Sequence, residues 1–444
     1  MAQAVSYRCK ILGYNNIFRD TISIYRDAVS FFVKVIEAEW SYIETQKRGA
    51  NLQFCLKVVE ELTINTKNRP LVRYPFKDEF HKFPCYLRRS AIMDALGIVN
   101  LYRANKEAYE KDKSGQPPKL RITHHVMPAF YRGNMYDMVS DDEVRLKIYH
   151  KKDWVYLTVK LREQDLKYIR KHCAGATVSS PIIERSGRNY FLRFAFTFKT
   201  ELRKTSLPKR KVLAVDLGLN HYAAMSIIES DGTVTGRKFI DFPVEKDRLF
   251  HALNKLKKMQ KESGSCNSKK LWKYIKRVND DISSKVAGAI AAYASQENVD
   301  LIVFEYLSLS GKKHGGKAQL LSLWRYRSIQ EMVECKAHRM GISIFRVPAA
   351  GTSALAYDGS GKVVRDSSNN SLCTFQNGKQ YNADLNASYN IGARYFLHEY
   401  EKTTPAKMWS QLEAKVPSLG KRTTRVLSTL TSYFVEAGCL QPSL

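Results

Sequence analysis

The chain has 444 residues, of which 44% are hydrophobic and 11% aromatic, so the composition excludes a disordered tail and predicts two to four folded units. Lys and Arg outnumber Asp and Glu by 72 to 43, which gives a formal net charge of +29. A surplus of this size favours a long polyanion as partner, because each neutralised phosphate releases condensed counterions. It argues against a membrane surface, because the basic residues are spread along the chain.

The localisation that we expect is a reducing cytoplasm. The sequence shows no signal peptide and no apolar run of the roughly 20 residues that a spanning helix needs. Its eight cysteines have no paired spacing, which predicts free thiols rather than disulfides.

The first part of the chain reads as one strand followed by helices. Residues 5–12 predict a short strand, and apolar residues at steps of three and four predict one long amphipathic helix over 15–45. Further helices are predicted at 51–62 and 86–109. Arg88 and Arg89 lie on the polar side of the third helix and could grip the backbone of a nucleic-acid duplex. A solvated charged face on an ordinary bundle is the open alternative.

After the breaker cluster SGQPPK at 114–119, the pattern changes to strands. Alternating apolar residues predict strands at 145–149, 154–161, 181–184 and 190–198, with a hairpin turn at Ser186-Gly187. Strands this short predict closure into a small β-barrel. The segment FYRGNMY within it presents Tyr131, Arg132 and Asn134 as candidate nucleic-acid contacts, with ordinary surface residues as the alternative.

The order of elements after the basic linker at 203–211 is that of an RNase H-like α/β domain. Strands at 212–216, 222–228 and 238–242 predict an antiparallel meander, and alternating helices and strands follow it. These later elements are helices at 246–261 and 269–297, a strand at 301–305, a helix at 320–340, a strand at 343–347 and a helix at 383–396. The last 45 or so residues read as helical and basic.

One carboxylate marks each of three segments of this domain. Asp216 and Glu305 end apolar strand-like runs, and Asp384 opens a helix-like segment. Carboxylates gathered at strand ends and a helix start can hold two Mg²⁺ about 4 Å apart, one activating water and one steadying the leaving oxygen. The simpler alternatives are a strand-end cap for Asp216 and a dipole-stabilising acid for Asp384. For Glu305, a bound metal would offset the cost of a buried carboxylate.

The motifs that carry a resemblance are FYRGNMY (130–136), AVDLGLNHYAA (214–224), VFEYLSLSG (303–311), ECKAHRMGISIFRVPAAGTS (334–353) and NADLNASYNIG (382–392). In this order they resemble the transposon-encoded TnpB nucleases and their descendants, the miniature type V CRISPR effectors. The resemblance implies a RuvC-type nuclease domain in which Asp216, Glu305 and Asp384 fall on the three catalytic acidic positions. It also implies a bound guide RNA that pairs with one strand of double-stranded target DNA.

The resemblance further implies a multidomain α+β architecture in which a helical recognition unit splits a wedge-like barrel. The expected segments are a first barrel strand at 1–14, the recognition unit at 15–118, the rest of the barrel at 119–205, the first two nuclease motifs at 206–348, a degenerate zinc-finger-like insertion at 349–381, the third motif at 382–397 and a basic helical tail at 398–444.

The sequence departs from the family at the insertion. Relatives usually carry four zinc-binding cysteines there, whereas this chain has Ala356 and Gly359 at the first pair of positions and Cys373 with Gln376 at the second. One thiolate cannot make a tetrahedral structural site. We therefore predict no zinc and a loop held by packing or by nucleic acid.

Basic residues beside the expected site are further candidates for nucleic-acid contact. Arg325, Arg327, Lys336 and Arg339 share one predicted helix, with plain surface charge as the alternative. His221 follows the first motif closely, and a lone histidine there favours a structural role.

The function predicted from these observations is an RNA-guided, Mg²⁺-dependent DNA endonuclease with no membrane partner. Two alternatives stay open: a nuclease-inactive, guide-directed DNA-binding repressor, and a structure-specific nuclease that needs no RNA. The sequence does not decide between a monomer and a homodimer on one RNA.

Overall fold

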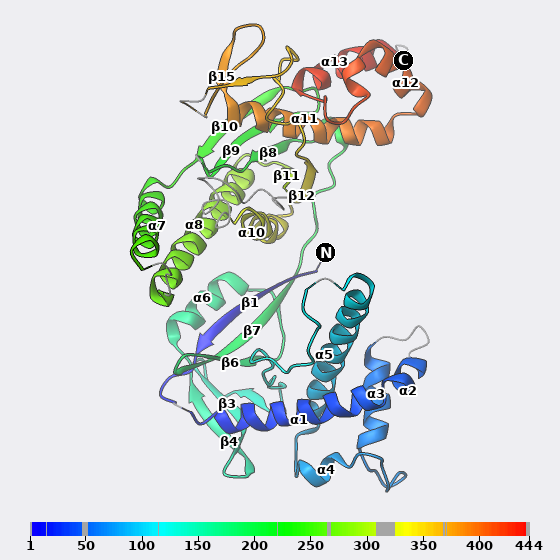
Figure 1. Cartoon of the computed structure of the whole chain (residues 1–444), viewed down its shortest axis with the longest axis vertical. Helices are drawn as coiled ribbons and strands as arrows, with labels where there is room; N and C mark the ends of the chain where they lie inside the picture. The colour runs from blue at the N-terminus through cyan, green and yellow to red at the C-terminus, as the bar shows by residue number, and fades with distance from the viewer. Residues whose placement is uncertain are drawn as a thin grey trace. The chain divides into compact units, whose positions relative to one another are not determined.

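The computed structural model describes residues 2–14, 16–46, 52–113, 115–219, 221–263, 268–307, 325–366, 369 and 371–440. These residues form two compact units, 2–198 and 199–440 (Figure 1). Among the described residues, no helix is long and apolar enough to cross a membrane.

The described part of the N-terminal unit joins six α-helices and seven strands around one hydrophobic core. Its helices are α1 (Arg19–Ala38), α2 (Trp40–Gln46), α3 (Leu52–Thr63), α4 (Phe76–Glu79) and α5 (Cys85–Asp112), followed later by α6 (Glu163–Cys173). Its strands are β1 (Ala2–Lys10), β2 (Tyr136–Met138), β3 (Glu143–His150), β4 (Asp153–Lys160), β5 (Thr177–Val178), β6 (Ile182–Ser186) and β7 (Asn189–Lys199). Apolar residues of both the helices and the strands belong to this core, so one continuous core joins the segments 15–118 and 119–205. The domain boundary between these segments stays a prediction.

The single helix predicted over 15–45 is wrong in one respect, because it is broken at Glu39 between α1 and α2. The Glu39 side chain is buried and its Oε1 accepts a hydrogen bond from the Tyr74 hydroxyl at 2.7 Å. Arg73 also pairs with it at 2.8 Å. A buried carboxylate needs such partners, and they lie some 35 residues away, out of reach of helical periodicity.

The predicted closed barrel is also wrong. The strands form two separate sheets, one with the order β1-β7-β5 in which β6 also pairs with β7, and one with the order β2-β3-β4. Among the described residues, isolated bridges such as the one between Ile11 and Leu161 connect segments of the two sheets. β2 and β5 have three and two residues, too few to complete a barrel wall, and α6, which the sequence analysis missed, follows β4 directly.

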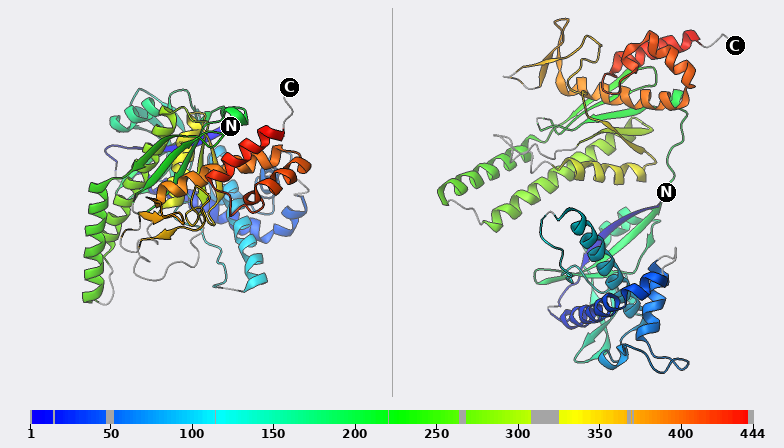
Figure 2. Two further views of the ribbon diagram at one scale, coloured as in Figure 1. Left: turned by 90° about the horizontal axis from the view of Figure 1, so that it is seen from above. Right: turned by 45° about the vertical axis from the view of Figure 1, so that its right-hand side comes forward.

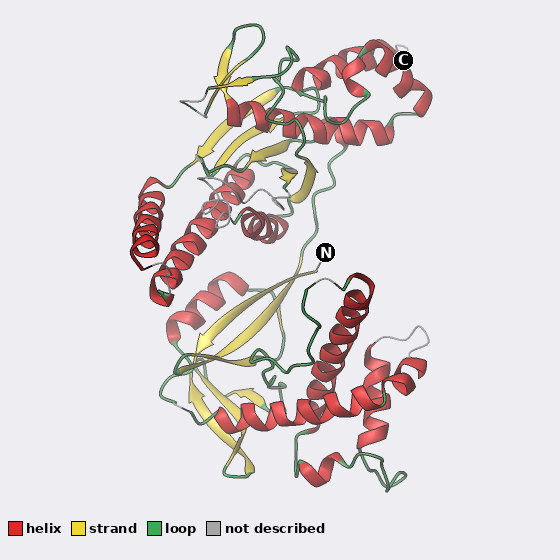
Figure 3. Ribbon diagram, in the orientation of Figure 1, coloured by secondary structure: helices red, strands yellow, loops and turns green. Residues whose placement is uncertain are grey.

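The C-terminal unit is built on a five-stranded sheet with the order β10-β9-β8-β11-β12 (Figure 3). Its strands are β8 (Val212–Asp216), β9 (Ala223–Ile228), β10 (Val234–Ile240), β11 (Leu301–Tyr306) and β12 (Ser343–Pro348). The first three pair antiparallel as the sequence predicts, and β11 pairs parallel with both β8 and β12. Its helices are α7 (Pro243–Ser263), α8 (Lys269–Gln296), α10 (Tyr326–Arg339), α11 (Ala383–Thr403), α12 (Ala406–Lys415) and α13 (Leu427–Leu440).

Strict alternation along the central strands sends their side chains to two different cores. Leu213 and Val215 of β8 pack with α8 and α10, whereas Val212 and Ala214 pack with α11 and α13. β11 alternates in the same way, with Ile302 and Phe304 on the first face and Leu301 and Val303 on the second. α7 packs against α8, and the two helices run together away from the sheet (Figure 2).

The segment before α11 forms a small three-stranded sheet of β13 (Val364–Arg365), β14 (Leu372–Thr374) and β15 (Gln380–Asn382). Part of the predicted helix at 320–340 lies outside the described residues, which resume at Arg325. The C-terminal tail is helical and packs against α11. Three apolar residues of α13 are buried in this contact, namely Leu427, Leu430 and Tyr433.

Candidate active site

Asp216 and Glu305 lie at the C-terminal ends of two neighbouring parallel strands, on the same face of the sheet. The pairing of β8 with β11 runs from Val212–Leu301 to Val215–Phe304, and the next pair in this register is Asp216 with Glu305. Neighbouring strands lie about 4.8 Å apart, and alternate residues share a face. Both carboxylates therefore continue the face of Ala214 and Val303, which is the face that α11 covers.

Asp384 reaches this face from the first turn of α11. The Asn382 side chain caps the helix by accepting hydrogen bonds from the backbone N–H groups of Asp384 and Leu385 at 3.0 and 2.9 Å. Gly392 lets the helix approach the sheet closely, because a Cβ there would clash with the Ile228 side chain and lie 3.2 Å from the Ala214 Cβ. The helix start is thus fixed beside the ends of β8 and β11.

The three carboxylates influence one another electrostatically. The pKa of Asp216 is raised well above its ordinary value, first by burial and then by the negative charges of Glu305 and Asp384. Burial also raises the pKa values of Glu305 and Asp384. Like charges that raise the pKa of Asp216 in this way lie near it, and a bound cation would relieve the repulsion.

Cationic and polar neighbours offset part of this repulsion. The Arg365 charge lowers the pKa values of both Asp216 and Asp384, and the His221 charge lowers that of Asp384. The buried Thr352 hydroxyl donates a hydrogen bond to Glu305 Oε1, which lowers the pKa of that carboxyl. His221, for which a structural role was favoured, therefore lies within electrostatic reach of the site.

A polar stripe on α11 holds the loop that carries Thr352. Asn390 donates hydrogen bonds to the carbonyls of Thr352 and Leu355, both at 2.9 Å. One turn further on, Arg394 donates to the carbonyls of Pro348 and Ala350 at 2.9 and 2.8 Å. The Arg394 guanidinium also donates to the carbonyls of Thr423 and Arg425 in the C-terminal tail.

Burial lowers the pKa of Arg394 to about 10, so the guanidinium stays charged at neutral pH, and its charge in turn lowers the pKa of Glu305. Sequence reasoning missed both Thr352 and Arg394. The spacing of the polar residues could have identified Arg394, because Asn386, Asn390 and Arg394 recur every four residues after Asp384 and so lie on one face of the helix.

The site fits divalent ions in its chemistry. All three groups offer carboxylate oxygens, the ligands that Mg²⁺ prefers, and Asp384 Oδ2 is buried without a hydrogen-bond partner among the described residues. Across the described parts of the chain, no group of three or more His, Cys, Asp and Glu side chains is arranged to hold a metal ion.

The predicted nucleic-acid contacts differ in how free their side chains are. Arg88 and Arg89 both pair with Glu60, at 3.2 and 3.4 Å, and Arg325 pairs with Asp280. Arg327 lies over the ring of Tyr326, and the Tyr131 ring lies 5.3 Å from that of Tyr86. Lys336 and Arg339 are half-buried on α10, whereas Arg132 and Asn134 are exposed. The role of all nine residues in binding stays a prediction.

The segment expected to be a degenerate zinc-finger-like insertion packs around a small apolar cluster. Ala356 and Cys373 are buried in a small apolar cluster with Phe375 and Ala383. The Cys373 thiol donates to the Tyr381 carbonyl at 3.4 Å, and burial raises its pKa. A thiol in such surroundings resists the ionisation that metal binding requires.

Comparisons with known proteins agree with the motifs. Residues 5–150 match the model of the Aq_aa04 family, and residues 326–391 match that of the Cas12f1-like TNB domain. The chain is 28% identical over 245 residues to the TnpB-like protein aq_aa05 of Aquifex aeolicus (strain VF5), which covers 50% of this chain and 78% of that protein.

Among solved structures, the fold is similar to that of the Cas12f1-sgRNA-target DNA complex, with a TM-score of 0.51 and 13% identity over 85% of this chain and 81% of that one. The mini-RNA-guided endonuclease CRISPR-Cas_phi3 gives a lower TM-score of 0.44 at 11% identity, over 88% and 92% of the two chains. The resemblance to TnpB and the miniature type V effectors is confirmed.

Proposed function

We propose that this protein is an RNA-guided DNA endonuclease whose single RuvC-type site hydrolyses phosphodiester bonds. The observation that carries the proposal is the convergence of Asp216, Glu305 and Asp384 on one face of the sheet, where the two other carboxylates raise the pKa of Asp216. The sheet order, a three-stranded meander beside two parallel strands, supports an RNase H-like domain.

The three acids would hold two Mg²⁺ through their carboxylate oxygens. When bound, divalent ions supply activation of the attacking water and neutralisation of the charge on the leaving oxygen. The residues of the chain position these oxygens: Thr352 orients Glu305 by hydrogen bonding, and Asn382 fixes the helix turn that carries Asp384. Arg394 ties the Thr352 loop to the tail, so the site depends on segments far apart in the sequence.

We include a guide RNA and a target DNA because a protein of similar fold binds both. The solved structure with the similar fold is that of a complex with a guide RNA and target DNA, and the net charge of +29 gives this chain the electrostatic means to bind both. In this view RNA pairing chooses the sequence and the protein reads heteroduplex shape. The place of action would be the bacterial cytoplasm or nucleoid.

The proposal is tested with the full chain expressed together with the non-coding DNA that flanks its gene, so that it co-purifies with its own RNA. The complex is offered a double-stranded DNA library. Cutting should need Mg²⁺, vanish in Asp216→Asn and disappear after RNase treatment. Glu331→Gln, which removes an exposed carboxylate of α10 outside the site, is the matched control and should cut like the wild type. Cutting that survives RNase would instead identify a guide-independent nuclease.

A nuclease-inactive, guide-directed DNA-binding protein is the second candidate. The same preparation separates the two candidates. RNA-dependent retention of specific DNA without cutting, at any Mg²⁺ or Mn²⁺ concentration, would establish the binding protein.

A further inference from the structure

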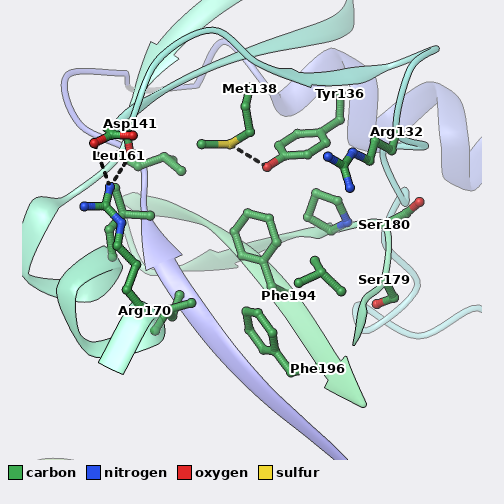
Figure 4. A pocket seen from close by; sticks show the side chains of 14 residues that line it. Arg132, Tyr136, Met138, Asp141, Leu161, Arg170, Ser179, Ser180, Phe194 and Phe196 are labelled. Carbon is green, nitrogen blue, oxygen red and sulfur yellow. Dashed lines mark hydrogen bonds and ion pairs between the residues drawn. The ribbon is translucent and has the colours of Figure 1, made fainter. Parts of the chain in front are cut away.

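The N-terminal unit contains a cavity where the predicted barrel fails to close (Figure 4). Its volume is about 340 Å³, and its walls come from β2, α6, β5 and β7. Ligand sites in proteins commonly span roughly 300–1,000 Å³, so this cavity suits one small group rather than a helix or a duplex.

Aromatic and aliphatic side chains form most of the cavity wall. The rings of Tyr136 and Phe194 lie 5.9 Å apart, and those of Phe194 and Phe196 lie 6.4 Å apart. Apolar side chains of α6 and β5 complete the wall, and Val178 at its rim is 44% exposed. A wall of this kind favours a flat, weakly polar body that can stack on or pack against rings.

Polar groups occur at separate points of the wall. Within the described chain, the Tyr136 hydroxyl donates to Met138 Sδ alone, at 2.9 Å, and a thioether sulfur is a weak acceptor. Burial raises the pKa of Tyr136 to about 12, so the hydroxyl remains a donor at neutral pH and can exchange the sulfur for a better acceptor. Ser180 adds a second hydroxyl to the lining.

The two arginines of the lining differ in their availability. Arg170 donates to the Asp141 carbonyl at 2.6 Å and lies 4.0 Å from its carboxylate, so its charge is already balanced. Arg132 is exposed, and no described residue pairs with its guanidinium. A ligand whose apolar body carries an anion on the Arg132 side would therefore match the cavity in both shape and charge.

We propose that this cavity binds one unstacked nucleotide of a single-stranded nucleic acid, with the base among Tyr136, Phe194 and Phe196 and a phosphate at Arg132. A nucleobase is flat and has polar edges for the two hydroxyls, and single strands are commonly bound through bases placed against aromatic rings beside basic residues. This inference rests on the proposed function, because it names a surface that takes one nucleotide of a bound strand.

The test uses the full chain, freed of RNA at high salt, and fluorescein-labelled single-stranded RNA and DNA decamers of mixed sequence. Binding is measured by anisotropy for the wild type and for R132A, Y136F and V178E. The last variant places a carboxylate at the exposed rim, where it opposes a phosphate. R188A is the matched control, because Arg188 is exposed in the β6–β7 turn and does not line the cavity.

V178E and R132A should weaken binding by about 10-fold and Y136F by about 3-fold, in line with the loss of one stacked or charged contact. R188A should stay within about 2-fold of the wild type. R132A should also reduce the slope of log affinity against log salt by about 0.7, as expected for one phosphate contact on a single strand.

A second readout does not depend on the variants folding well. Decamers that carry 4-thiouridine should cross-link, on irradiation, to peptides that contain Tyr136 or Phe194. Cross-links confined to other peptides, or V178E and R132A binding like R188A, would overturn the inference. So would an apolar dye bound in the cavity that no decamer displaces.

These outcomes are separable from those of the proposed function. Failure of the cavity proposal leaves RNA-dependent cutting by the wild-type chain unaffected. Failure of the nuclease proposal leaves decamer binding and the cross-link unaffected.

Discussion

The carboxylate site of the C-terminal unit and the aromatic cavity of the N-terminal unit show two different ways in which this chain places polar chemistry. The first gathers acidic groups at the ends of buried strands, where the protein leaves their repulsion only partly compensated. The second leaves an apolar space open and sets beside it Arg132, whose guanidinium is paired with no residue that the structure describes. The first therefore calls for a cation, and the second for a flat ligand that carries an anion.

The difference has a structural origin. Regular alternation along β8 and β11 fixes the face on which Asp216 and Glu305 lie, so few alternatives exist once the strands pair. The cavity arises because two sheets approach each other without closing, and its lining comes from four elements spread between residues 132 and 196.

Asp216→Asn should have the largest effect, and it should act on the carboxylate site without affecting the cavity. Cutting should fall by roughly 10³-fold or more, as for residues that act as one unit in catalysis. In metal-free buffer the Tm of the same variant should rise, because one of three mutually repelling charges is removed. Decamer binding at the cavity should not change. A variant with a lowered Tm and normal cutting would show that Asp216 only supports the fold.

Arg394→Met tests whether the carboxylate site depends on the tail. Four backbone carbonyls would lose their charged donor inside the protein, and the free energy of unfolding should fall by roughly 3–5 kcal/mol. Arg422→Met is the control, because Arg422 is exposed in the same tail, and it should change stability by less than about 0.5 kcal/mol. Denaturant titration measures both. Equal losses would remove the special role of Arg394.

The stability of the metal-free protein should depend on pH through the same three acids. Their folded-state pKa values are raised above the ordinary 3.8 and 4.5, so above about pH 4 the folded state binds more protons than the unfolded state. This contribution to stability is therefore lost as pH rises through the folded values.

Mg²⁺ should reverse that loss. At a concentration about 100 times its Kd, a bound ion adds about 2.7 kcal/mol, so the rise in Tm should be larger at pH 8 than at pH 5, where protons compete for the carboxylates. Asp216→Asn should shrink the difference. A Tm shift that is equal at both pH values, or unchanged in the variant, would locate the bound Mg²⁺ elsewhere.

Thr352→Val removes a single hydrogen bond of the carboxylate site, the one from the Thr352 hydroxyl to Glu305. Without the hydroxyl, the ionised form of Glu305 loses a donor and its pKa should rise. The acid limb of the pH–rate profile should then move upward by about one unit, while Thr352→Ser should restore the wild-type profile. Profiles that coincide for all three proteins would mean that this hydrogen bond does not tune the reaction.

Sequence patterns were sufficient for the elements that local periodicity determines. The antiparallel meander, the parallel strand that carries Glu305 near its end and the helix that begins beside Asp384 are all visible as alternation or capping in the chain. The break at Glu39, the open sheets and the Arg394 contacts with the tail were not. Each depends on partners more than 25 residues away, and no local pattern encodes such a partner.

The central claim, that Asp216, Glu305 and Asp384 form one divalent-ion site, is tested most directly by Mn²⁺ binding followed with EPR, in which the signal of free Mn²⁺ falls as ions bind. The wild type should show saturable binding that Asp216→Asn and Asp384→Asn each weaken by at least about tenfold, whereas Glu331→Gln should bind like the wild type. Equal binding by all four proteins would contradict the claim.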